Sequence, residues 1–167
     1  MTGVIELRFV GGRLLQGEHE LARVGVDAYI TASGHPYGIV RTKTRGWRYA
    51  VKDRETEGLV CHFDGLPIRR GGTLRSGAVE LSLRGRPLRP RSWRFRTETG
   101  GRIEVGSRVS RGDPFKFALL LRSEDSIAQI PAAPLVLALG CWVIVNWENA
   151  PAGSISDPAG IPWGVSG

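Results

Sequence analysis

The sequence contains few of the residues on which catalysis, metal binding and covalent cross-linking usually depend. Among 167 residues there are two cysteines, three histidines and one methionine. Cys61 and Cys141 lie 80 residues apart in dissimilar surroundings, which argues against a disulfide framework and favours a reducing compartment. The spacings typical of zinc ligands, of a nucleophile-elbow serine and of phosphate-binding glycine loops are absent. We therefore expect no enzyme activity, no cofactor and no metal.

Long apolar runs are also scarce. The longest one extends from Ala132 to Val145 and contains Pro134, whereas a membrane-spanning helix needs about 20 apolar residues. The first ten residues mix Glu6 and Arg8 with apolar side chains and do not resemble a signal peptide. We expect a cytoplasmic protein, either free or associated peripherally with a membrane.

Lysine is rare among the basic residues, which comprise three lysines and twenty arginines. The formal net charge is +7, and residues 69–96 hold nine arginines against a single acid, Glu80. This segment has a charge of +8, whereas the rest of the chain sums to −1. A charged partner of this protein is therefore expected to be anionic.

Short alternating segments between glycines extend from Val4 to about Arg122 and indicate an all-β domain. In one of them Trp93 and Phe95 alternate with arginines, so that one face of the strand is apolar and the other charged. Segments of this kind recur about nine to eleven times, which predicts an antiparallel barrel or sandwich.

The pattern changes in the C-terminal part of the chain. Pro131 and Pro134 suit the N-terminus of a helix, and residues 135–147 are apolar on every side, so a helix here must be enclosed by other elements. A buried strand is the alternative, because residues 142–145 favour β structure and Gly140 disfavours a helix.

The domain organisation follows from these patterns. Residues 1–149 are expected to form one β domain, a barrel or a sandwich, that includes the helix. Residues 150–167 are rich in proline, glycine and serine and are expected to form a flexible tail.

Two tryptophan-containing segments are similar to each other. Arg45–Tyr49 and Arg91–Phe95 share the order arginine, small residue, tryptophan, arginine and aromatic residue at an offset of 46. The match indicates either a duplicated strand unit or a coincidence in an arginine-rich chain.

The chain resembles the tubby C-terminal-like proteins, a group that includes LURP-one-related proteins and phospholipid scramblases, in the stretches Arg45–Lys52, Arg91–Thr97 and Ala132–Trp147. The resemblance covers the order of elements across roughly residues 4–148 and implies a twelve-stranded antiparallel barrel around a central helix. Together with the number of alternating segments, it leads us to expect a closed antiparallel barrel of about 9–12 strands around a hydrophobic C-terminal helix. A basic surface binds phosphoinositide headgroups in tubby proteins, so the resemblance implies an anionic lipid as the partner. The tubby headgroup motif and the calcium-binding and palmitoylation residues of scramblases have no counterpart in this sequence.

Histidines are the main candidates for acid–base chemistry near neutral pH, and they are His19, His35 and His62. Cys61, His62 and Asp64 contain the residue types of a nucleophile, base and orienting acid. Adjacent residues of a strand point to opposite faces, however, so Cys61 and His62 are not expected to share a site. An enzyme would require His35 or His62 in a concave site with a carboxylate in reach.

The arginine-rich segment is the candidate binding site. Guanidinium groups bind phosphate in bidentate fashion, so this segment suits a phospholipid headgroup or an anionic membrane surface. The alternatives are a nucleic-acid-binding barrel, a surface for a protein partner and a solvated basic face without a ligand. The candidate residues are Arg84, Arg94 and Arg96 on the polar faces of strands and Arg86, Arg89 and Arg91 in turns.

The indole rings of Trp47 and Trp93 could stack on the bases of a single-stranded nucleic acid. Their alternation with Arg48 and Arg94 places them on the face opposite to the charges, and we expect both in the core.

Overall fold

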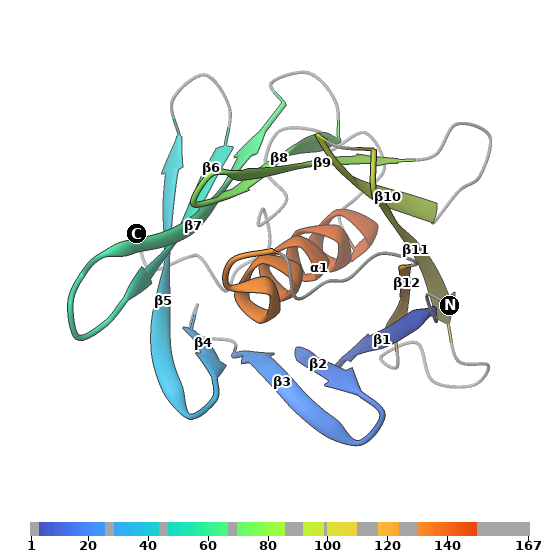
Figure 1. Ribbon diagram of the computed structural model, residues 1–167, viewed down its shortest axis with the longest axis horizontal. Coiled ribbons are helices and arrows are strands. Elements are labelled where there is room, and N and C mark those ends of the chain that lie inside the picture. The colour runs from blue at the N-terminus through green and yellow to red at the C-terminus, as the bar shows by residue number, and fades with distance from the viewer. Residues whose placement is uncertain are drawn as a thin grey trace.

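The computed structural model describes residues 4–25, 29–43, 47–66, 70–85, 92–98, 100–109, 117–123 and 130–149, which form a closed barrel of twelve antiparallel strands around one helix (Figure 1). The strands are β1 (Ile5–Val10), β2 (Arg13–Gln16), β3 (His19–Val24), β4 (Tyr29–Ala32), β5 (His35–Lys43), β6 (Trp47–Asp53), β7 (Leu59–Gly65), β8 (Gly71–Ser76), β9 (Val79–Gly85), β10 (Ser92–Thr97), β11 (Arg102–Val109) and β12 (Phe117–Ser123). The helix is α1 (Ala133–Asn149).

The strands follow one another around the barrel in chain order, and β12 pairs with β1 to close it. At this closure Leu7 lies opposite Leu121, and both side chains point into the core. Every described strand is paired on both sides, so the sheet has no open edge at which another chain could add. The expected fold, a closed antiparallel barrel of 9–12 strands that encloses a hydrophobic helix, is confirmed.

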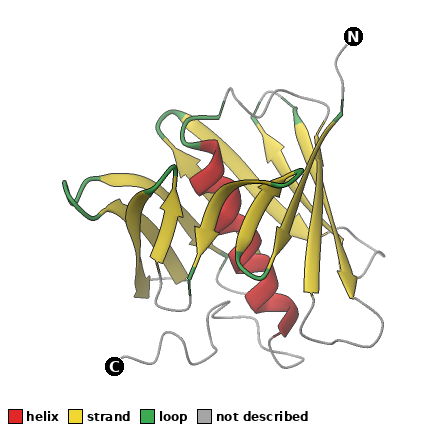
Figure 2. Cartoon of the chain, turned by 90° about the horizontal axis from the view of Figure 1, so that it is seen from below, coloured by secondary structure: helices red, strands yellow, loops and turns green. Residues whose placement is uncertain are grey.

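Helix α1 runs through the barrel, with strands around its whole circumference (Figures 1 and 2). Each side chain from Leu135 to Ile144 is buried, as expected for a helix without a polar face. The helix is therefore the correct interpretation of this segment, and the alternative of a buried strand is wrong. No helix within the described residues combines the length and apolar character that crossing a membrane requires.

Gly140 allows the helix to approach the barrel wall closely. A Cβ atom at this position would lie 2.7 Å from the ring of Phe95 on β10 and 3.0 Å from Leu74 Cδ1 on β8. Close packing against these two strands therefore outweighs the low helix propensity of glycine.

Aromatic side chains pack along the C-terminal half of the helix. Trp147 stacks on Trp93, with ring centroids 5.1 Å apart, and contacts Phe63 edge-on at 5.8 Å. Trp142 meets Tyr49 edge-on at 5.1 Å. The expected core position of Trp93 is confirmed, since only 6% of this residue is exposed.

Three sequence-based expectations fall outside the described residues. They concern the side chain of Trp47, the second member of the expected tryptophan pair, and the tail at residues 150–167. They also concern the turn that contains Arg86, Arg89 and Arg91.

Candidate anion-binding surface

Three of the predicted arginines, Arg84, Arg94 and Arg96, belong to the described residues and lie on the outer face of neighbouring strands. Arg84 on β9 is the cross-strand partner of Arg94 on β10, and Arg94 is in turn opposite Glu104 on β11. The adjacent residues Leu83, Trp93 and Phe95 are buried inside the barrel. The polar face that alternation predicted for these strands is therefore the outside of the barrel.

Arg84 and Arg94 already bind groups of the barrel wall. Arg84 Nη1 donates hydrogen bonds to the carbonyl oxygens of Gly72 and Leu83, both at 2.8 Å. Arg94 Nε donates to Glu104 Oε1 at 2.8 Å. These two guanidinium groups tie β8, β9, β10 and β11 together, so they are held in place before any ligand arrives.

Arg96 differs from these two residues. It is exposed, and its cross-strand partner on β11 is Arg102, which is exposed as well. Neither guanidinium forms a hydrogen bond or ion pair with the residues that the structure describes. Like charges directly opposite each other on neighbouring strands repel, and an anion placed between them would relieve this repulsion.

Arg102 was missing from the sequence-based candidates because it lies beyond the arginine-dense segment. The alternation of Arg102 with Ile103 and Val105 places it on the outer face. Its position beside Arg96 depends on the tight turn between the strands, in which Thr97 N donates to Gly101 O at 2.8 Å. The alternation and the tight turn can both be recognised in the sequence, although neither of them is a cluster of charged residues.

A second arginine pair on the same barrel shows how such repulsion is relieved. Arg13 on β2 and Arg23 on β3 are also cross-strand partners. Here Glu20 Oε1 accepts hydrogen bonds from Arg13 Nε at 2.7 Å and from Arg23 Nε at 2.9 Å. The hydrogen bond from Arg13, followed by that from Arg23, lowers the pKa of the Glu20 carboxyl below its ordinary value. One oxyanion between two guanidinium groups is therefore a stable arrangement on this barrel.

Cys61 and His62 point to opposite sides of β7, as alternation predicted. Cys61 is 1% exposed, and its burial raises the pKa of the thiol to about 12. His62 Nε2 lies outside the core, 3.2 Å from Asp64 Oδ2, and Asp64 also pairs with Arg48. Cys141 is fully buried in the helix, and burial raises its pKa as well. Both cysteines pack as apolar core residues, and Cys61 and His62 do not share a site, as expected from their positions on the strand.

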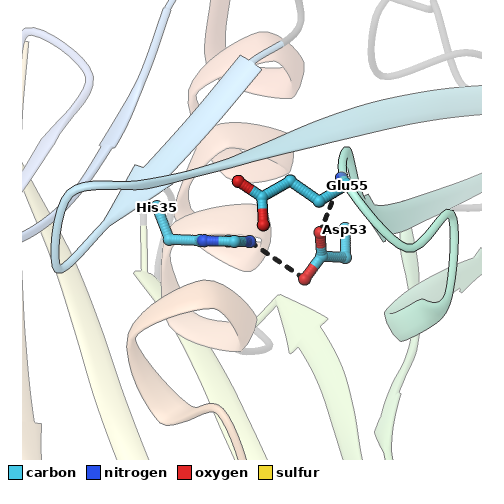
Figure 3. Close-up of side chains that lie close together, drawn as sticks. All are labelled: His35, Asp53 and Glu55. Atoms are coloured by element: carbon cyan, nitrogen blue, oxygen red, sulfur yellow. Dashed lines mark hydrogen bonds and ion pairs between the residues drawn. The ribbon is translucent and has the colours of Figure 1, made fainter.

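His35 also has a carboxylate in reach. Its Nε2 atom lies 2.9 Å from Asp53 Oδ2, and Glu55 lies beside the pair (Figure 3). The hydrogen bond with His35 and the backbone amide of Glu55 lower the pKa of Asp53. His35 and His62 thus each have a carboxylate in reach, which is one of the two conditions for an enzyme, the other being a concave site around the histidine.

Comparison with known proteins finds no matching family model, curated protein or solved structure.

Proposed function

We propose that this protein is a non-catalytic binding module that holds an anionic phospholipid headgroup between Arg96 and Arg102. The observation that carries the proposal is the exposed pair of guanidinium groups on neighbouring strands, without an acidic partner among the described residues. A phosphate presents several oxygen atoms and can accept hydrogen bonds from both arginines at once.

The ligand is proposed to bind on the outer surface because helix α1 fills the interior of the barrel. Barrels that carry a ligand inside them leave space between the strands. In this protein helix α1 and its aromatic contacts occupy the axis of the barrel (Figure 2). A charged headgroup would also lose its hydration among apolar side chains, whereas the outer face offers both water and arginine.

The environment of the described tryptophans favours lipid over single-stranded nucleic acid. Base stacking needs an aromatic ring on the same side as the phosphate-binding arginines. Trp93 instead lies inside the barrel against Trp147. The resemblance to tubby-like proteins, whose implied architecture agrees with this barrel and helix, is a further argument for a lipid and for membership of that family.

Co-sedimentation with vesicles tests this proposal. The chain should bind vesicles of phosphatidylcholine mixed with phosphatidylserine and should not bind phosphatidylcholine alone, and high salt should release it. Each basic residue near such a surface contributes about 1 kcal/mol, so the double variant Arg96→Ser with Arg102→Ser should bind about 30-fold more weakly.

The double variant Arg13→Ser with Arg23→Ser is the matched control. It removes the same charge from another exposed cross-strand pair, whose guanidinium groups are already bound to Glu20. We expect it to bind anionic vesicles nearly as well as the wild type. Equal losses in the two variants would show nonspecific attraction and contradict the proposal. Gel shifts with single-stranded and duplex DNA, in the absence of vesicle binding, would assign the surface to nucleic acid instead.

A further inference from the structure

We infer that His35, Asp53 and Glu55 form a binding site for a divalent transition-metal ion such as Zn²⁺. Each of the three residues offers one ligand atom, and these atoms all lie within 4.8 Å of one another (Figure 3). Ligand atoms around one such ion are about 3–4 Å apart for metal–ligand bonds of about 2.0–2.2 Å. Glu55 is exposed, so its side chain is free to turn toward an ion held by His35 and Asp53.

Two neighbouring hairpins bring the three side chains together. His35 begins β5, directly after the turn from β4, and Asp53 ends β6, while Glu55 follows in the turn toward β7. The register between β5 and β6 places Tyr37 opposite Asp53, so that His35 extends over the same corner of the barrel. Tyr37 also contacts the His35 ring edge-on at 4.9 Å and limits its rotation.

Asp53 is oriented before any ion binds. Its Oδ1 atom accepts hydrogen bonds from the backbone amides of Glu55 at 2.8 Å and Thr56 at 3.3 Å. Its Oδ2 atom is thereby directed toward His35 Nε2. Outer contacts of this kind, which fix the direction of a ligand, raise the affinity of metal sites.

Asp53 differs from the other acidic residues of the described strands in the residue with which it forms an ion pair. The structure describes six acidic residues within strands, and five of them form ion pairs with arginine. Asp53 pairs with a histidine instead. The nearby Arg54 is drawn away onto the ring of Tyr29, with its guanidinium carbon 4.2 Å from the ring centroid. Two carboxylates beside an imidazole therefore have no arginine or lysine among their described ion-pair partners.

One imidazole and two carboxylates form a ligand set that Zn²⁺, Co²⁺ and Mn²⁺ accept, with water in the remaining positions. Binding requires a neutral His35 whose Nε2 lone pair faces the ion. Any proton on Nε2 is released to solvent, and the ion replaces the hydrogen bond to Asp53. The site involves no redox step, and it revises the expectation that the chain binds no metal.

Isothermal titration of the chelator-treated full chain with Zn²⁺ tests the inference, together with the absorption spectrum of the Co²⁺ form. We expect one ion per chain, loss of binding in His35→Ala and a weakening of about tenfold or more in Glu55→Gln. Glu55 is exposed in a turn, so Glu55→Gln should retain the circular dichroism and melting temperature of the wild type.

His62→Ala provides the matched control, because His62 lies 3.2 Å from Asp64 in a similar pair that Arg48 already neutralises. This variant should bind Zn²⁺ as the wild type does. The inference is overturned if the wild type binds neither Zn²⁺ nor Co²⁺. It is also overturned if His62→Ala loses as much affinity as His35→Ala, since the ion would then bind elsewhere.

Discussion

Gly140 determines how closely the helix can approach the wall of the barrel. Glycine in the middle of a helix costs about 1 kcal/mol relative to alanine, so the residue looks unfavourable in the sequence. In the folded protein the ring of Phe95 occupies the space that a Cβ atom would need. The packing of a helix inside a closed barrel thus decides the residue type at this position.

Replacement of Gly140 by alanine should therefore destabilise the protein. The gain in helix propensity is about 1 kcal/mol, whereas overpacking of a filled core costs about 1–3 kcal/mol, and the clash with Phe95 lies at the upper end. We expect the free energy of unfolding in urea to fall by about 1–2 kcal/mol. Gly106→Ala is the control, because Gly106 is exposed and a Cβ atom there meets no atom within 4 Å. A Gly140→Ala variant as stable as the wild type would refute the packing argument.

The positions of single residues could be predicted where they depend on the alternation within one strand. Alternation correctly placed Arg96 outside the barrel, and it placed Cys61 and His62 on opposite faces of their strand. Arg102 and the His35–Asp53 pair could not be found in this way, because each depends on the register between two strands. The arginine cluster also gave no sign that Arg84 and Arg94 are bound to wall groups, since their partners come from neighbouring strands or from the backbone.

At the scale of elements, the sequence patterns indicated about nine to eleven short alternating segments and one apolar run, and the structure has twelve strands and one helix among the described residues. Strand β2 is hard to recognise in the sequence because it has only four residues between glycine turns. Strand β8 is hard to recognise because its inward positions include Gly72 and Ser76. Gly72 is required there by the Phe63 ring, which a Cβ atom would approach to 2.4 Å, and Ser76 Oγ donates to Pro131 O at 2.6 Å. Contacts between elements, rather than local preference, select these residues.

Because helix α1 is enclosed by the barrel, we predict that the thiol of Cys141 is protected from reagents in solution. Cys141 should react with a disulfide reagent only after the barrel opens, and Cys61 should behave alike because its pKa is raised to about 12. We expect both thiols to react at least about 1,000-fold more slowly in buffer than in denaturant. The Cys61→Ser variant isolates the Cys141 signal. Rapid reaction of Cys141 in the native protein would show that the helix leaves the barrel easily.

The charge of the whole molecule is organised as pairs across its strands. In the part of the chain that the structure describes, three arginine pairs lie directly opposite each other, namely Arg13–Arg23, Arg84–Arg94 and Arg96–Arg102. Glu20 binds both members of the first pair, and carbonyl groups and Glu104 bind the second. Only the Arg96–Arg102 pair has no such partner among the described residues, and for this reason we propose it as the point at which a protein of net charge +7 binds an anion.

The most direct test of the proposed headgroup site measures vesicle binding after a substitution that places a carboxylate beside Arg96. Ser82 lies opposite Arg96 on β9, so Ser82→Glu places a carboxylate beside that guanidinium, as Glu104 is placed beside Arg94. Thr42→Glu, opposite Arg48 on another part of the barrel, changes the charge equally and is the control. We predict that Ser82→Glu sharply weakens binding to phosphatidylserine vesicles, whereas Thr42→Glu binds nearly as well as the wild type. Undiminished binding by Ser82→Glu, or equal loss in both variants, would contradict the assignment of the headgroup to Arg96 and Arg102.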